Sequence, residues 1–233
     1  MKTFMLVHGA WHGAWCWRDV ASGLREAGHR VFMPGQTGSG ELAHLLSPDI
    51  TLDRYVRDVV DVLESEDLSE VVLVGHSFGG ISISGAADRV PHRIRHLVYL
   101  DSLILNDGQS AFSIIAPEVA AARRAQALAS GGISIPVPDP AAFGVTVPEQ
   151  AAWLRKECTP QPLSTYEDVF RLNGEIGNGL PATYIAVTPH YLPTTASRNY
   201  ARARPDWRYL ELLAGHDAMV TTPAALTEIL LGI

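Results

Sequence analysis

The sequence predicts an α/β fold built on a mostly parallel sheet of about six strands flanked by helices. Short apolar runs bounded by turn residues have the composition of buried parallel strands. They span residues 4–7, 30–33, 71–74, 94–100, 183–187 and 208–213. Helical patterns separate the first four runs, and this order is typical of βαβ units. At 233 residues, 47% hydrophobic and 18% charged, the chain can form one such domain with its own core.

Helices are expected at residues 17–27, 52–66 and 79–90, and a last one at 223–231 opens with Pro223. The second shows the helical period most clearly. Its apolar stripe consists of Leu52, Val56, Val59, Val60 and Leu63. A stripe of this kind covers one face of a sheet.

After Leu100 the alternation of strands and helices stops until residue 183. Helices are expected within this insertion at 117–130, 148–158 and 165–176, around a segment rich in Pro and Gly at 131–140. We interpret it as a helical cap, residues 102–180, in a single domain 1–233 whose core is 1–101 and 181–233. A disordered linker is the alternative, but its apolar residues argue against it. These include Phe112, Ile115, Phe143, Trp153 and Phe170.

Composition excludes several partners and locations. Eighteen Lys and Arg against 25 Asp and Glu give a net charge of −7, and no basic run occurs, so nucleic acid is not an expected partner. No apolar stretch approaches the roughly 18–20 residues of a membrane span, and the N-terminus lacks a signal-peptide pattern. The two cysteines, Cys16 and Cys158, have no CxxC spacing. A cytoplasmic protein is expected.

Ser77 is the expected nucleophile. It is the central residue of Gly-His-Ser-Phe-Gly at 75–79, directly after the strand 71–74 and at the start of a helix. Such a turn exposes the serine hydroxyl at the carboxyl edge of the sheet. An anion-binding turn is the alternative. A dinucleotide-binding turn is disfavoured, because the first strand leads into His-Gly-Ala-Trp instead of GxGxxG.

His216 is the expected general base. A serine hydroxyl is a poor nucleophile at neutral pH and needs a histidine to accept its proton. In this type of sheet that histidine follows the last strand, and His216 lies between the strand 208–213 and the final helix.

Asp101 is the expected acid that orients this histidine. Residues 188–199, after the penultimate strand, contain no Asp or Glu. Asp206 precedes the last strand, at the wrong edge of the sheet, and the side chain of Asp217 should diverge from its neighbour His216. Asp101 ends the strand 94–100 and should emerge at the same edge as Ser77. A helix or turn cap is the alternative role for Asp101.

The oxyanion donors and the pocket follow from the same loops. The backbone N–H groups of Ala10 and Phe78 are expected to bind the oxyanion, since one lies after the first strand and the other follows the nucleophile. The pocket is expected to be apolar, although each candidate could equally belong to the core. The candidates are Gly9, Trp11, Leu103, Phe112 and Met219.

Three segments carry a family resemblance: residues 7–15 (Val-His-Gly-Ala-Trp-His-Gly-Ala-Trp), 75–79, and 215–219 (Gly-His-Asp-Ala-Met). Together they resemble the α/β-hydrolase superfamily, and more narrowly the plant methylesterase and hydroxynitrile lyase family with its bacterial esterase relatives. The resemblance runs from Phe4 to near Leu231 and implies an α/β-hydrolase fold. Family members often form dimers, so the resemblance is compatible with a homodimer.

Two departures from the family matter. Plant members usually place the acid after the penultimate strand, whereas this chain offers Asp101 one strand earlier. The lyase branch has a threonine after the first strand and a lysine beside the catalytic histidine, where this chain has Gly9 and Asp217. A carboxylate near departing cyanide would oppose lyase chemistry.

The expected function is therefore that of a serine carboxylesterase (EC 3.1.1.-) acting on small to medium, largely uncharged esters through an acyl-enzyme. This chemistry requires neither a metal nor an organic cofactor. Two alternatives stay open: a hydroxynitrile-lyase-like C–C lyase on the same triad, and a catalytically silent ligand-binding receptor of hydrolase fold.

Overall fold

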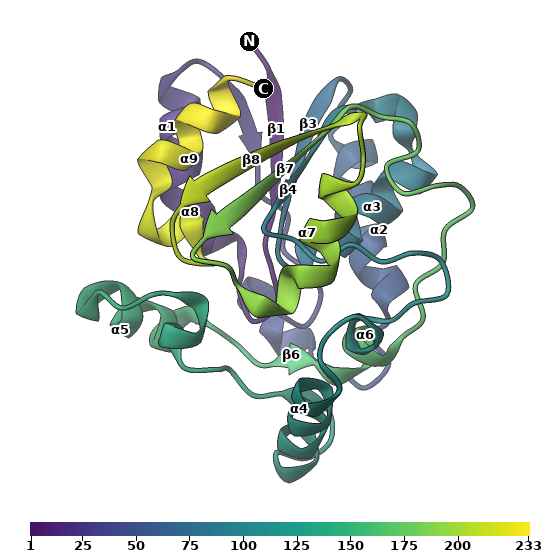
Figure 1. Cartoon of the computed structure of the whole chain (residues 1–233), viewed down its shortest axis with the longest axis vertical. Helices are drawn as coiled ribbons and strands as arrows, with labels where there is room; N and C mark the ends of the chain where they lie inside the picture. Colours follow the sequence, from purple (N-terminus) through teal and green to yellow (C-terminus); the bar gives the residue numbers. More distant parts are fainter.

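A computed structural model of the chain describes all of its residues, 1–233. One six-stranded sheet has the order β2-β1-β3-β4-β7-β8, with every neighbouring pair parallel (Figure 1). The strands are β1 Thr3–Val7, β2 Arg30–Phe32, β3 Val71–His76, β4 Ile94–Leu100, β7 Ala182–Thr188 and β8 Trp207–Leu213. All six expected strands are present, which confirms the predicted fold class.

Helices cover both faces of this sheet (Figure 1). They are α1 Arg18–Glu26, α2 Leu52–Ser65, α3 Gly79–Arg89, α7 Thr195–Arg202, α8 Ala218–Thr221 and α9 Pro223–Leu231. Helix α1 packs against α9, and α2 packs against α3. The stripe expected on α2 is buried, with Leu52, Val56, Val59 and Leu63 at most 2% exposed. Helices α7 and α8 have no counterpart among the expected elements.

The segment between β4 and β7 lies beyond the carboxyl ends of the strands, and α4 protrudes at the lower end of the molecule (Figure 1). It contains α4 Pro117–Ala129, α5 Pro148–Glu157, α6 Leu163–Glu167 and the antiparallel pair β5 Ser134–Ile135 and β6 Gln161–Pro162. Phe112, Ile115, Phe143 and Phe170 join the same hydrophobic core as the sheet. A disordered linker would not bury these side chains.

The helix expected at 165–176 is wrong beyond residue 167. Asp168 leaves the helix with an extended backbone, and its carboxylate accepts a hydrogen bond from the Leu52 N–H at 2.8 Å. Phe170 then exchanges backbone hydrogen bonds with the 108–109 turn. Tertiary contacts of this kind override a local preference for helix. The chain after Asp168 therefore has no regular secondary structure and lies over α2 and α3.

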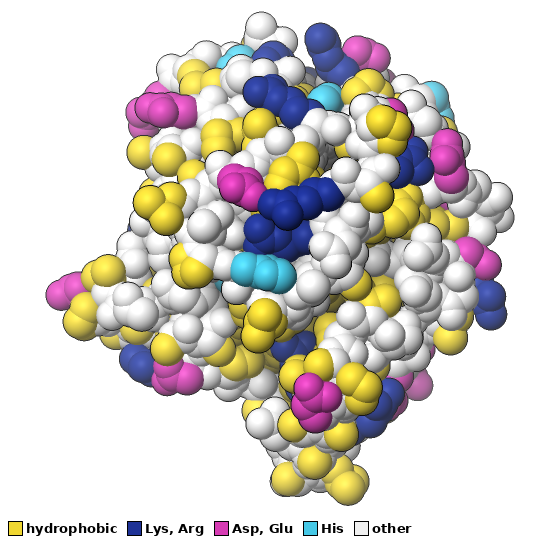
Figure 2. Space-filling model, in the orientation of Figure 1, with side chains coloured by type: hydrophobic (Ala, Val, Ile, Leu, Met, Phe, Trp, Pro, Cys, Tyr) yellow, Lys and Arg dark blue, Asp and Glu magenta, His cyan; other side chains and the backbone are white.

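The surface carries mixed charge. On the face shown in Figure 2, acidic and basic side chains are interspersed, and the protruding end that carries α4 shows apolar atoms. Leu128 in α4 is 78% exposed. None of the helices combines the length and the hydrophobicity that crossing a membrane requires.

Candidate active site

Ser77 occupies the tight turn between β3 and α3. Its φ is 51°, in the left-handed region that non-glycine residues rarely adopt. A Cβ added to Gly75 would lie 2.7 Å from the carbonyl oxygen of Gly79, so the turn closes only around glycine. Ser77 is half-buried while its neighbours on both sides are buried. The turn therefore presents the hydroxyl outward, as the motif predicts.

Ser77, His216 and Asp101 form one continuous hydrogen-bonded chain. His216 Nε2 lies 2.9 Å from Ser77 Oγ, and His216 Nδ1 lies 2.7 Å from Asp101 Oδ2. Asp101 is fully buried and His216 is 4% exposed. The structure thus brings together the three side chains that the sequence nominated as a triad.

The position of Asp101 follows from the order of the strands. β3 and β4 are neighbours, with His76 in register with Leu100, so Ser77 and Asp101 leave the sheet side by side. The Asp101 N–H donates to the Ile185 carbonyl at 2.7 Å, and the Thr194 hydroxyl donates to Asp101 Oδ1 at 3.2 Å. Sequence reasoning missed Thr194, because a threonine in a loop carries no signal of its own.

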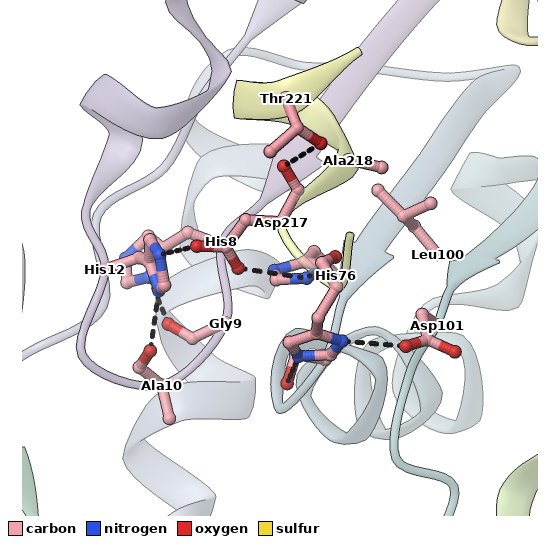
Figure 3. A network of polar contacts seen from close by, with 12 residues as sticks. His8, Gly9, Ala10, His12, His76, Leu100, Asp101, Asp217, Ala218 and Thr221 are labelled. Carbon is pink, nitrogen blue, oxygen red and sulfur yellow. Dashed lines mark hydrogen bonds and ion pairs between the residues drawn. The ribbon is translucent and has the colours of Figure 1, made fainter. Parts of the chain in front are cut away.

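The other two acids that the sequence offered lie elsewhere. Asp206 is exposed and pairs with Arg204 at 2.7 Å. Asp217 is fully buried, and its carboxylate bonds to His12 instead of the His216 ring (Figure 3). Asp217 therefore bonds to the loop after β1 and takes no part in orienting His216.

His12 lies between two hydrogen-bond acceptors. Its Nδ1 is 2.8 Å from the Ala10 carbonyl, and its Nε2 is 3.0 Å from Asp217 Oδ2 (Figure 3). A carbonyl and a carboxylate can only accept, so both ring nitrogens donate when His12 is an imidazolium. Burial lowers the pKa of His12, but the adjacent Asp217 carboxylate outweighs burial and raises that pKa above its usual value.

His76, by contrast, is neutral. Burial, followed by the proximity of His216 and His12, holds its pKa well below the usual range. Its Nε2 donates to the His216 carbonyl at 3.0 Å, and its Nδ1 has no partner. The ring centroid lies 4.6 Å from that of His216. His76 therefore supports the His216 loop without placing a second positive charge beside it.

His76, His216 and Asp217 are the one group of three side chains close enough to hold a metal ion together. Both nitrogens of His216 already bond to Ser77 and Asp101, and Nε2 of His76 bonds to a carbonyl. Only His76 Nδ1 and Asp217 Oδ1 in this group have no hydrogen-bond partner, so a metal ion here would have to displace existing hydrogen bonds of His216.

The loop after β1 passes directly against the serine turn. A Cβ on Gly9 would lie 2.8 Å from the Ser77 Cβ, so only glycine allows this approach. No hydrogen bond of the turns and loops uses the backbone N–H of Ala10 or of Phe78. These two predicted oxyanion donors therefore remain available at the site.

The predicted pocket residues separate into two groups. Trp11 and Phe112 pack around Tyr166, at ring-centroid distances of 6.1 and 5.2 Å, and the Leu103 N–H donates to the Ser77 carbonyl at 2.8 Å. Gly9 belongs to the same group, because it lies against the Ser77 turn. Met219 instead lies fully buried in α8, which packs against η1 (Ala14–Trp17), α1 and α9.

Tyr191 is a site residue that sequence reasoning missed. Its ring stacks on His216 with a centroid distance of 3.7 Å and an interplanar angle of 19°. It comes from the loop after β7, where an aromatic side chain is part of no recognisable motif. Burial raises the pKa of the Tyr191 phenol, which keeps it protonated.

This fold, with a serine on a sharp strand-to-helix turn and a histidine after the last strand, defines the class of α/β hydrolases. The sequence matches the alpha/beta hydrolase family over residues 4–229. The chain belongs to this family and is an enzyme of the hydrolase class.

Its relatives agree with this assignment. A carbendazim hydrolyzing esterase from Nocardioides sp. (strain SG-4G) is 39% identical over 98% of both chains. An alpha-hydroxynitrile lyase from Arabidopsis thaliana is 41% identical over 43% of this chain and 40% of its own length. A solved extracellular α/β-hydrolase from a Paenibacillus species, described as a structural and functional homologue of Tobacco Salicylic Acid Binding Protein 2, has a TM-score of 0.86 at 27% identity, covering 100% of this chain and 98% of its own. The predicted resemblance is confirmed.

Proposed function

We propose that the protein hydrolyses carboxylic esters, with Ser77 as nucleophile, His216 as general base and acid, and Asp101 as the acid that orients His216. The observation that carries this proposal is the hydrogen-bonded chain from Ser77 Oγ through both nitrogens of His216 to Asp101, at 2.9 and 2.7 Å. Similarity to an esterase over nearly the whole chain supports the same reaction.

In the first half of the reaction Ser77 Oγ attacks the ester carbonyl while His216 Nε2 accepts its proton. The Asp101 carboxylate stabilises the imidazolium that forms. The N–H groups of Ala10 and Phe78 bind the oxyanion of the tetrahedral intermediate. As the intermediate collapses, the ester C–O bond breaks, His216 gives its proton to the leaving alcohol, and Ser77 carries the acyl group.

In the second half a water molecule gives a proton to His216 and its oxygen attacks the acyl carbon. Collapse releases the carboxylic acid and returns the proton to Ser77. All protons move through His216, so the cycle needs no metal or organic cofactor. The neutral ring of His76 suits this role, because a second imidazolium beside His216 would oppose its protonation.

The surroundings of the serine favour apolar substrates. Trp11, Phe112 and Tyr166 form an aromatic cluster that continues through Phe78, whose ring lies 4.9 Å from Tyr166. Such walls suit small to medium, largely uncharged esters. Carbendazim is a useful first probe, given the name of the Nocardioides relative. The cytoplasmic location and the homodimer stay predictions.

The testing experiment compares wild type with Ser77→Ala. Wild type should hydrolyse p-nitrophenyl acetate and longer acyl esters, and a fluorophosphonate should add one mass label to it. Ser77→Ala should do neither. Labelling without ester cleavage would support Ser77 as the nucleophile but would show that the reaction is not hydrolysis of these esters. Absence of both would favour the silent ligand-binding receptor.

Lyase activity is a second candidate, favoured by the similarity to a hydroxynitrile lyase. It predicts that wild type releases cyanide from mandelonitrile faster than Ser77→Ala does. Equal rates in the two proteins would remove this candidate.

A further inference from the structure

Arg123 is an unpaired cation in the wall of the site. It lies in α4, where its guanidinium carbon is 5.1 Å from the Trp11 ring and 5.3 Å from the Tyr166 ring. Its neighbour Arg124 pairs with Glu167 at 3.1 Å, whereas Arg123 forms no ion pair. The charge of Arg123 is therefore held between two aromatic faces and is not neutralised by an acid.

Both aromatic partners connect Arg123 to the reacting atoms. Trp11 directly follows Ala10, and the Tyr166 ring lies 4.9 Å from that of Phe78. Ala10 and Phe78 are the residues whose N–H groups we assign to the oxyanion. The guanidinium thus contacts the two aromatic side chains that adjoin these residues.

A surface groove is lined by both Arg123 and Tyr191, the residue whose ring stacks on His216. Its walls include Arg123, Ala122, Pro138, Ala142 and Tyr191. Tyr191 also stacks on His216, so the groove and the proposed general base share this ring as a wall. Substrate that reaches Ser77 past Tyr191 would run beside Arg123.

A lone cation in this place has a chemical consequence. The protein has a net charge of −7, so its overall field opposes anions. Inside the groove the facing charges are Arg123 and the exposed Glu118. The two aromatic rings contact the guanidinium, and a guanidinium has N–H donors in a planar fork that matches the two oxygens of a carboxylate.

We propose that Arg123 determines specificity by binding a carboxylate carried by the substrate at the end remote from the scissile bond. This inference rests on the proposed ester hydrolysis and extends its substrates from uncharged esters to monoanionic ones. The rest of such a substrate would lie against the aromatic cluster. The pair Arg123–carboxylate would contribute mainly to ground-state binding, and hence to KM.

Three esters of equal acyl length test the proposal. p-Nitrophenyl hexanoate is neutral, mono-p-nitrophenyl adipate carries its carboxylate on the acyl side, and 4-carboxyphenyl hexanoate carries it on the alcohol side. Their kcat and KM are measured with wild type, Arg123→Gln, Arg123→Lys and Arg124→Gln. The last variant removes the same charge from the same helix, one residue away.

For at least one carboxylate ester, Arg123→Gln should raise KM relative to the neutral ester by about three- to tenfold, the range for a half-exposed charge pair. Arg123→Lys should raise this relative KM less, because lysine keeps the positive charge and loses only the two parallel N–H donors of the guanidinium. Arg124→Gln should leave the ratio of the two KM values, carboxylate ester to neutral ester, unchanged. The ester that responds identifies which side of the substrate occupies the groove.

An unchanged ratio in Arg123→Gln for both carboxylate esters would overturn the proposal, as would an equal loss in Arg124→Gln, which would mean only a general charge effect. Should Arg123→Gln fail to fold, the comparison of Arg123→Lys with Arg124→Gln decides. If wild type cleaves no ester, calorimetric binding of 4-carboxyphenyl hexanoate to Ser77→Ala, with and without Arg123→Gln, separates failure of the subsite from failure of the reaction.

Discussion

Asp217 follows His216 in the chain, yet its carboxylate bonds to His12, with 3.0 Å between Oδ2 and Nε2. The pair joins the loop after β8 to the loop after β1, which carries the Ala10 N–H. Both side chains are at most 1% exposed. One charged pair therefore ties the loop of the proposed general base to the loop of a proposed oxyanion donor.

Breaking this pair should destabilise the protein. Asp217→Asn leaves the His12 imidazolium without its counter-charge, and the loss of one partner of a buried ion pair costs about 3–5 kcal/mol of unfolding free energy. The double variant His12→Gln, Asp217→Asn should lose less than the sum of the single losses. Urea denaturation of wild type, Asp217→Asn, His12→Gln and the double variant measures these losses of unfolding free energy. Additive losses would show that the two residues do not interact.

Asp101→Asn should lower kcat by up to about 10⁴-fold, because the amide no longer fixes the imidazole tautomer or stabilises the imidazolium. Ester hydrolysis and the rate of fluorophosphonate labelling measure the effect. Asp206→Asn is the matched control, since that exposed carboxylate pairs only with Arg204. Retained activity in Asp101→Asn would remove the acid assignment and leave Ser77 and His216 in place.

Gly9→Ala should impair both folding and activity. The new methyl would stand 2.8 Å from the Ser77 Cβ and 2.9 Å from His76 Nδ1, so the serine turn or the β1 loop must move. Overpacking of this kind costs about 1–3 kcal/mol. Gly174→Ala serves as the control, because its nearest neighbour would be 3.5 Å away. Equal melting temperatures and equal kcat for the two variants would contradict the close approach.

Acid should destabilise the fold through its buried neutral histidines. Burial, as the main cause, lowers the pKa of His8 from 6.5 to about 4 and holds that of His76 well below its usual range. In the unfolded protein these histidines bind protons at a higher pH than in the folded protein. The unfolding free energy should therefore fall as the pH drops from about 6.5 towards 4.

The contribution of His12 has the opposite sign. Its pKa is raised in the folded state, so the stability it supplies is complete below about pH 6.5 and is lost as the pH rises through the folded pKa. Urea denaturation at several pH values tests both signs. His8→Gln should flatten the acid limb, and a slope unchanged by this substitution would contradict the role given to His8.

Local sequence patterns predicted most of the architecture. Apolar runs and turn residues located all six strands of the large sheet, and the Gly-x-Ser-x-Gly turn located Ser77. The position of Asp101 was predictable because a residue that ends a parallel strand emerges at the carboxyl edge, wherever that strand lies in the chain.

Contacts between distant segments were not predictable. His12 and Asp217 are separated by 205 positions, and no sequence motif predicts that they pair. Tyr191, Tyr166 and Arg123 reach the site only through packing of the inserted segment and of the loop after β7. The irregular run after Asp168 depends on partners such as Leu52, which local propensity does not encode.

The location of the acid on β4 leaves the loop between β7 and α7 without a carboxylate to hold in place. Only Thr194, at the end of that loop, bonds to Asp101. Tyr191 must stay in this loop, because its ring stacks on His216, but the exposed His190 and Leu192 can be exchanged while Asp101 stays anchored to its own strand. At these two positions, acceptance of new substrates can be engineered separately from the rate of the proposed acyl transfer.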